Sequence, residues 1–154
     1  MGTEIERKFL VTGDAWKAAA SPGVRIRQGY LCSDKERTVR VRIAGDQAWL
    51  TVKGLTRGSS RPEFEYPVPL PDGEAMLAMC ERPLLEKIRR RVAHGGLEWE
   101  VDVFEGDNAG LVLAEVELER ADQPVPLPAW AGLEVTDDPR YYNVTLAKHP
   151  MPRP

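Results

Sequence analysis

Short stretches of alternating apolar and polar residues run through most of the chain, and they constrain its fold more than any other feature. Side chains two positions apart on a strand point the same way, so an alternation of period two predicts a strand with one apolar face. Turn residues such as Gly45-Asp46 and Gly95-Gly96 separate successive stretches, as in antiparallel hairpins. The predicted strands cover residues 3–11, 24–32, 38–43, 48–53, 61–68, 84–93, 97–104 and 111–120.

Fewer helices than strands are predicted, and they are recognised by the residues at their ends. Asp72 can cap a helix over residues 73–80, because a short polar side chain there accepts a hydrogen bond from the first helical turn. Asp138 precedes the start of another helix at Pro139, and residues 14–20 are predicted to form a third. We therefore predict an α+β protein, mainly β, in which an eight-stranded antiparallel closed β-barrel is covered by a few helices.

The length and composition are those of one globular domain. A chain of 154 residues, 42% of them apolar and 29% charged, is long enough to bury one core and short for two. Three prolines within residues 121–131 predict an extended linker rather than regular structure. We assign residues 1–150 to a single domain and residues 151–154 to a tail.

Charge and apolar content argue against two classes of partner. The formal net charge is −3, which gives no overall basic field for nucleic acid, and no run approaches the roughly 18 apolar residues of a membrane helix. Cys32 and Cys80 suggest two reduced thiols, with a single bridge left open, and the first residues do not resemble a secretory signal. We therefore expect a cytoplasmic protein that binds neither nucleic acid nor membrane.

The polar faces of the predicted strands carry charges that are mostly of one sign in each strand. On the first strand, Glu4, Glu6 and Lys8 share one face, while Ile5 and Phe9 share the other. Later strands repeat this arrangement with basic and then with acidic side chains. The blocks are Arg40 and Arg42; Lys87, Arg89 and Arg91; Glu98, Glu100 and Asp102; and Glu115, Glu117 and Glu119.

Two interpretations of this face are open from the residues alone. The polar side of an antiparallel strand ordinarily faces solvent, yet like charges at alternate positions repel one another, and ordinary surfaces intersperse the two signs. A closed barrel with this face inward offers carboxylates for metal ions and Lys and Arg for phosphates, which gives a charged lumen. Oxygen ligands suit Mg²⁺ or Mn²⁺, and His94 and His149 lack the spacing of a zinc site.

The N-terminal E-x-E-x-K strand, from Glu4 to Lys8, resembles the signature of the CYTH family, also called the triphosphate tunnel metalloenzymes. Further motifs follow in the family's order: TVRVRI at 38–43, TVK at 51–53, EFE at 63–65, EKIR at 86–89, WEVD at 99–102 and AEVELE at 114–119. The resemblance spans nearly the whole chain, and the YYN sequence at 141–143 is similar to the start of the family's closing helix. It implies a barrel whose lumen binds a triphosphate together with Mg²⁺ or Mn²⁺, with two ions in the active complex.

The resemblance also implies residue roles, position by position. Tyr30 is interpreted as a residue that tunes the site or simply packs. The implied metal-binding carboxylates are Glu4, Glu6, Glu63, Glu65, Asp102, Glu115 and Glu117. The implied phosphate-binding residues are Lys8, Arg40, Arg42, Lys53, Lys87, Arg89 and Arg91. The implied catalytic set is Glu4, Glu6, Lys8, Glu115 and Glu117.

The expected reaction is metal-dependent hydrolysis of a small anionic substrate. One ion and the basic side chains hold the phosphates, while a second ion lowers the pKa of the water that attacks the terminal phosphorus in line. We expect inorganic tripolyphosphate to be cleaved to pyrophosphate and phosphate. The alternatives are a class IV adenylyl cyclase, a nucleoside or thiamine triphosphatase, and a non-catalytic polyphosphate or nucleotide sensor.

Two groups of apolar residues receive no role in the site. Trp16, Trp49, Trp99 and Trp130 are assigned to packing, since scattered tryptophans usually fill cores. Outward positions such as Val39 and Val41 face either a covering helix or a second subunit in a homodimer, and the sequence does not separate these alternatives.

Overall fold

The computed structural model describes residues 2–34, 36–58 and 60–150. The predicted tail, residues 151–154, lies outside the described residues. The described strands are β1 (Gly2–Val11), β2 (Val24–Asp34), β3 (Arg37–Ala44), β4 (Gln47–Lys53), β5 (Ser60–Val68), β6 (Leu85–His94), β7 (Leu97–Phe104), β8 (Val112–Glu117) and β9 (Ala131–Glu134). The described helices are α1 (Leu70–Ala78), α2 (Asn143–Lys148) and the 3₁₀ turns η1 (Ala15–Ala19), η2 (Gly106–Asn108) and η3 (Pro139–Tyr141).

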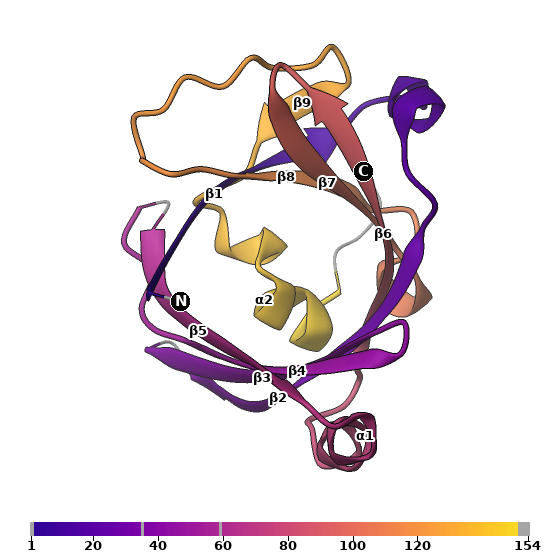
Figure 1. The fold of residues 1–154 in the computed structure, drawn as a ribbon, viewed down its shortest axis with the longest axis vertical. Coiled ribbons are helices and arrows are strands. Elements are labelled where there is room, and N and C mark those ends of the chain that lie inside the picture. Colours follow the sequence, from indigo (N-terminus) through magenta and orange to yellow (C-terminus); the bar gives the residue numbers. More distant parts are fainter. Residues whose placement is uncertain (1, 35, 59, 151–154) are drawn as a thin grey trace.

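Eight of these strands form one closed antiparallel ring. The order is β5-β4-β3-β2-β6-β7-β8-β1, and β1 pairs with β5 to complete the circuit. Figure 1 looks into the ring along its opening. The predicted eight-stranded antiparallel architecture with few helices is therefore confirmed.

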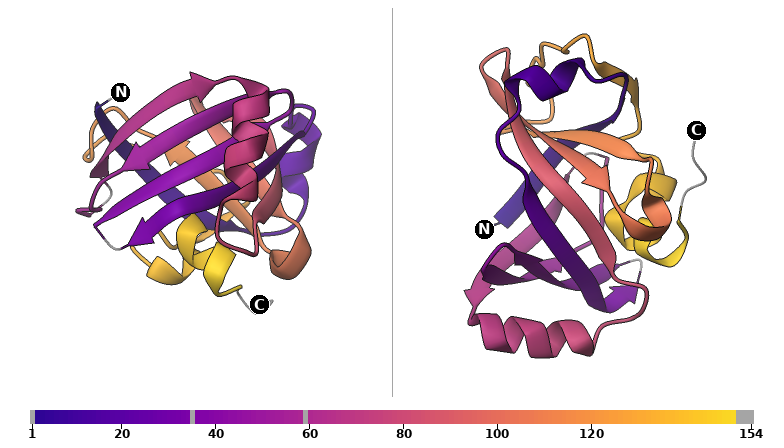
Figure 2. Two further views of the ribbon diagram at one scale, coloured as in Figure 1. Left: turned by 90° about the horizontal axis from the view of Figure 1, so that it is seen from below. Right: turned by 90° about the vertical axis from the view of Figure 1, so that its right-hand side faces the viewer.

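The outward side of the ring is apolar and is covered in two places. Helix α1 lies across β2, β3 and β4 (Figure 2), where Leu77 packs on Val41 and Ile43. A larger cluster contains Phe9 and Trp99, under the long segment that precedes β9. Burial of this apolar face is the main source of stability that the ring has.

A third apolar cluster closes one end of the ring. Inward side chains at the ends of β2, β6 and β7, among them Tyr30 and Leu85, pack against Leu146 and Ala147 of α2. Figure 1 shows α2 within the outline of the ring, and the right-hand view of Figure 2 places it at one side, away from α1. We call this the α2 end, and it leaves the opposite opening as the other way into the ring.

Several predicted boundaries need correction. The extended linker was predicted to end at residue 131, and no strand was predicted after it, but residues 131–134 form β9, which pairs with β1. Helix α1 begins at Leu70 rather than at residue 73, because Pro71 supplies the fixed backbone angle that the first helical turn requires. The third predicted helix is a 3₁₀ turn, and β8 ends at Glu117, three residues early.

The ambiguity at Val41 is resolved in favour of a covering helix. Val41 is fully buried by packing in the cluster beneath α1, so it is not available to a second subunit. No described helix is both long and apolar enough to cross a membrane.

Candidate active site

The inner face of the ring is lined by charged side chains that are buried. Lys87 and Asp102 are 0% and 1% exposed, and Lys8, Arg40, Lys53 and Glu115 are each below 8%. Arg40, Lys53 and Glu115 line a cavity of about 190 Å³ in the lumen. Burial of so many charges is costly unless each has a partner, so the pairing of these groups determines what the cavity can bind. Its walls are formed by Glu4, Glu6, Arg40, Arg42, Lys53, Glu63, Glu65, Arg89, Glu100, Glu115, Glu117 and Asn143.

Strand register sets some opposite charges side by side and some like charges face to face. Lys53 lies opposite Glu63 across β4 and β5, and Arg89 lies opposite Asp102 across β6 and β7. In contrast, Glu6 lies directly opposite Glu117 across β1 and β8. Like charges directly opposite one another destabilise a sheet, so this register is not explained by stability.

Asp102 holds two cations in fixed positions. One carboxylate oxygen, Oδ2, lies 2.8 Å from Lys87 Nζ, and Arg89 donates from Nε to Oδ1 at 2.8 Å and from Nη2 to Oδ2 at 2.9 Å. Burial alone raises the pKa of Asp102, but Lys87 and Arg89 outweigh it and hold that pKa well below the usual range. Asp102 is therefore an anion at neutral pH, engaged by two cations.

Glu115 and Glu4 are also neutralised by bases. Burial raises the pKa of Glu115, but Lys8, 3.8 Å away, and Arg89, 3.3 Å away, lower it to about 2. Lys53 and Arg61 likewise outweigh the burial of Glu4 and lower its pKa. Lys53 Nζ donates to Glu4 at 3.1 Å.

Like-charged groups gather in two patches of the cavity wall, one around Glu6 and one around Arg42. Burial raises the pKa of Glu6 to about 8, with further contributions from Glu115 and Glu4. Burial and neighbouring carboxylates also raise the pKa of Glu63 and of Glu117. On the other side, burial lowers the pKa of Arg42, and the adjacent cations Arg40 and Arg89 lower it further. A cation beside Glu6 and an anion beside Arg42 would each relieve this repulsion.

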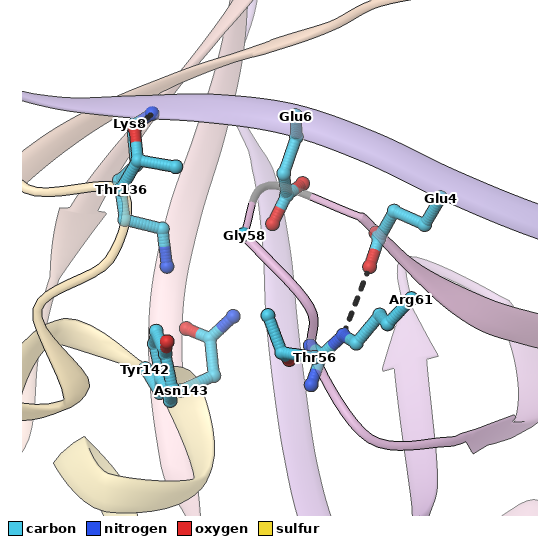
Figure 3. Close-up of a pocket in the computed structure, with 9 residues that line it drawn as sticks. All are labelled: Glu4, Glu6, Lys8, Thr56, Gly58, Arg61, Thr136, Tyr142 and Asn143. Atoms are coloured by element: carbon cyan, nitrogen blue, oxygen red, sulfur yellow. Dashed lines mark hydrogen bonds and ion pairs between the residues drawn. The ribbon is translucent and has the colours of Figure 1, made fainter. Parts of the chain in front are cut away.

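The α2 end brings a segment distant in sequence into contact with these side chains. Lys8 Nζ donates to the main-chain oxygen of Tyr141 at 3.0 Å, and Lys87 Nζ donates to Asn143 Oδ1 at 3.3 Å. Figure 3 shows Asn143 facing Glu6 across a small cavity of about 40 Å³, with Arg61 bonded to Glu4 at its edge. The C-terminal segment thus supplies a polar side chain to the lumen.

Tyr30 lies in the apolar wall near α2 and also lines a cavity of about 10 Å³ with Arg40 and Lys53. Its ring is 6% exposed in the apolar cluster beneath α2, and its hydroxyl accepts a hydrogen bond from Gln28 at 3.2 Å. Burial raises the pKa of Tyr30. This position agrees with a packing role and leaves the tuning role as a prediction.

The structure places the residues of the predicted site on the inner face, with one at its margin. Arg91 lies near the opening opposite α2, where its side chain is 62% exposed and pairs with Glu98. Three lumen residues were left out of the predicted site: Arg61, Glu100 and Asn143. The alternation of period two already put Arg61 and Glu100 on the charged face. Nothing in the local pattern placed Asn143 there, since its segment reaches the lumen only through tertiary packing.

The carboxylates of the lumen have the chemistry to bind a hard divalent cation. Among the described residues, no three Asp, Glu, His or Cys side chains are already arranged to hold a metal ion. Burial and neighbouring carboxylates raise the pKa of Glu6, Glu63 and Glu117, and a bound cation would favour their ionised forms. Their oxygens are the ligands that Mg²⁺ and Mn²⁺ prefer. Glu6 is buried beside Glu115 and Glu4, and a cation bound there would offset the cost of its charged form.

A closed antiparallel ring whose lumen is lined by both acidic and basic side chains is the architecture that the motifs predicted. Comparisons with known proteins identify the same family. The CYTH domain model matches residues 2–142, so the chain belongs to the CYTH family, as its motifs predicted. A curated inorganic triphosphatase from Acetivibrio thermocellus is 49% identical over 97% of this chain and 96% of its own length. Another, from Nitrosomonas europaea, is 38% identical over 94% of this chain and 97% of its own length.

Solved structures agree in fold. A crystal structure of an inorganic triphosphatase superimposes with a TM-score of 0.65, at 35% identity over 96% of this chain and 95% of that one. A putative adenylyl cyclase from Hippeastrum, described as having a dominant triphosphatase activity, has a TM-score of 0.57 at 14% identity, over 78% of this chain and 80% of that one. The second likeness concerns the fold alone.

Proposed function

We propose that this protein hydrolyses inorganic tripolyphosphate to pyrophosphate and phosphate in the lumen of the ring. The observation that carries the proposal is a lumen cavity whose wall combines a carboxylate patch around Glu6 with a basic patch around Arg42. A polyphosphate and a divalent cation are the two partners that such a pair of patches requires. The curated triphosphatases at 49% and 38% identity support the same reaction.

The basic side chains bind and orient the phosphate chain. Arg40 is held by Thr51 and Glu65, at 3.1 and 3.2 Å, and Arg89 is held by Asp102. Because these guanidinium groups are already positioned, little side-chain entropy is lost when they bind phosphate. The proposed phosphate ligands are Lys8, Arg40, Arg42, Lys53, Lys87, Arg89 and Arg91.

The carboxylates would hold Mg²⁺ or Mn²⁺. Glu6, Glu63 and Glu117 form the carboxylate patch, and Glu4, Glu65 and Glu115 line the same cavity. The main role of Asp102 is to position the side chains of Lys87 and Arg89. A role as a metal ligand is secondary. When bound, the ions supply neutralisation of the phosphoryl charge and a water of lowered pKa. The buried walls keep bulk water from the reacting phosphoryl group.

The test is phosphate release from tripolyphosphate, ATP and thiamine triphosphate, each with Mg²⁺, with Mn²⁺ and with chelator. We expect release from tripolyphosphate to be fastest and to stop with chelator. Faster release from ATP or thiamine triphosphate, or formation of cyclic AMP, would move the assignment to those alternatives. Tight binding without turnover would identify a sensor. The choice between the ions, the cytoplasmic location and a homodimer remain predictions.

A further inference from the structure

Most bases that face the lumen are held by a carboxylate, and Arg42 is the exception. Arg40 lies 3.2 Å from Glu65, and Arg89 lies 2.8 Å from Asp102. Ion pairs also hold the other bases, which are Lys8, Lys53, Arg61, Lys87 and Arg91. Among the lumen bases that the structure describes, Arg42 alone has no carboxylate in ion-pair contact. A different kind of group therefore holds Arg42 in place.

That group is the side-chain amide of Gln28. Gln28 lies opposite Arg42 across β2 and β3, and Arg42 Nε donates to Gln28 Oε1 at 3.0 Å. Because a guanidinium only donates, its partner must be the amide oxygen, and this fixes the orientation of the amide. The amide nitrogen then donates to the Tyr30 hydroxyl at 3.2 Å. Gln28 is 0% exposed, so both ends of this buried amide have a partner.

An amide and a carboxylate of the same length can hold Arg42 in the same way, but they differ in charge. Burial and the adjacent cations Arg40 and Arg89 lower the pKa of Arg42, and a carboxylate at position 28 would relieve this repulsion. The neutral amide of Gln28 orients the guanidinium and leaves the repulsion in place. A neutral residue here is therefore explained better by the binding of an external anion than by stability.

Arg42 reaches the space in which such an anion would bind. It is partly exposed and lines the lumen cavity of about 190 Å³. It also lines a cavity of about 620 Å³ at the opening opposite α2, whose wall includes Trp49. Gln28 lines neither of these two cavities. Any effect of Gln28 on a ligand in the lumen must therefore pass through the side chains that it holds.

We propose that Gln28 is a positioning residue that orients Arg42 without neutralising it, so that the charge of Arg42 is met by a phosphate group of the substrate. The hydrogen bond to Gln28 uses Nε, and the terminal nitrogens Nη1 and Nη2 carry the remaining donors of the guanidinium. A guanidinium that is already oriented loses less entropy when it binds phosphate. The inference rests on the proposed triphosphate site and adds to it a residue that does not touch the substrate.

The first experiment exchanges Gln28 for Glu, which keeps the length of the side chain and adds a charge. We expect Gln28→Glu to raise the KM for tripolyphosphate about tenfold, with a smaller change in kcat, because Arg42 would then be neutralised from within the protein. The midpoint of urea unfolding should not fall, since a carboxylate there accepts hydrogen bonds from both Arg42 and the Tyr30 hydroxyl. A purely structural role for Gln28 would give no such separation of KM from stability.

Gln47→Glu is the matched control. Gln47 begins β4, is exposed, and lines the 620 Å³ cavity. The substitution therefore adds the same charge near the same opening, but where solvent screens it. We expect Gln47→Glu to leave both the KM for tripolyphosphate and the unfolding midpoint unchanged.

A double-mutant cycle tests whether Gln28 acts through Arg42. Gln28→Met keeps an unbranched side chain and removes both hydrogen bonds. We expect it to raise the KM about threefold when Arg42 is present, from the loss of one orienting hydrogen bond, and to have no effect on the KM in Arg42→Ala. The cycle also decides the inference if Gln28→Glu does not fold.

The inference is overturned if a folded Gln28→Glu keeps the wild-type KM, or if Gln28→Met raises the KM equally with and without Arg42. Failure of the proposed function looks different, as a wild type that binds tripolyphosphate and does not cleave it. Calorimetric titration of tripolyphosphate with Mg²⁺ into the same variants then gives dissociation constants that decide the inference in place of the KM. A wild type that does not bind tripolyphosphate overturns both.

Discussion

The two faces of the same strands are both buried, but they are buried for opposite reasons. On the outward face, Trp99 is 0% exposed between Phe9 and Trp130, with ring centroids 5.6 Å from each. On the inward face, Lys87 is also 0% exposed, against Asp102. Removing an aromatic ring from water stabilises the fold, whereas removing a charge costs free energy that its partner only partly returns. The outward face thus accounts for the fold, and the inward face for binding.

The largest loss of stability is expected from a substitution on the outward face. Trp99→Ala should lower the free energy of unfolding by about 3–5 kcal/mol, since it leaves a cavity in the aromatic cluster. Urea titration followed by circular dichroism measures the loss. Trp49→Ala is the matched control on the inward face of β4, and it should lose much less. Equal losses for the two variants would break the comparison between the faces.

On the inward face, the largest effect should be on turnover. Glu117→Gln keeps the shape of the side chain but removes a charge from a crowded group of carboxylates. We expect the kcat for tripolyphosphate to fall about a hundredfold or more, with no loss of stability. Phosphate release and urea titration of the same preparation measure both. Glu119→Gln, beyond the end of β8 and exposed, is the control that should retain full activity.

Arg40 and Arg37 allow the two faces to be compared on one strand. Arg40 points inward and is 4% exposed, whereas Arg37 points outward and is exposed. Arg40→Ala should raise the KM for tripolyphosphate about tenfold, because one charge-assisted contact to phosphate is lost. Arg37→Ala should leave the KM unchanged in the same steady-state assay. If Arg40→Ala unfolds the chain instead, the buried cation is structural, and the phosphate assignment loses its support.

The smallest predicted change in stability comes from breaking an ion pair outside the lumen. Arg7 on β1 donates to Glu134 on β9 at 2.7 and 2.9 Å, and this hydrogen bonding lowers the pKa of Glu134. A carboxylate with a lowered folded-state pKa contributes stability that is present above its unfolded pKa and lost as the pH falls through the folded value. Glu134→Gln should therefore cost about 0.5 kcal/mol at pH 7, given that the pair is partly exposed.

The cost of Glu134→Gln should disappear once the wild-type carboxylate is protonated in acid. Urea titrations of both proteins at neutral pH and at a pH below the folded-state pKa of Glu134 provide the comparison. A difference that is independent of pH would mean that the substitution acts through packing of β9 rather than through charge.

The sequence predicted much of the site because the charged positions follow a local rule. Alternation of period two assigned Glu6, Arg40 and Lys87 to one face of their strands, and the order of the motifs indicated the family. The sequence did not predict β9, since four residues after a proline-rich segment carry little pattern of their own. It also missed Asn143, whose place beside Lys87 depends on how the C-terminal segment packs.

What the sequence by itself determined is which side chains share a face, because that depends only on the geometry of an extended chain. It also determined that this face carries two signs of charge in separate blocks. The tertiary structure alone decided which side of the sheet became the interior. It also decided which carboxylates pair with bases, as Asp102 does, and which are crowded by other carboxylates, as Glu6 is. It also decided that Trp49 lines an opening while Trp99 lies in a core. These outcomes depend on ring closure and strand register, which bring together residues distant in sequence, and no local pattern encodes those distances.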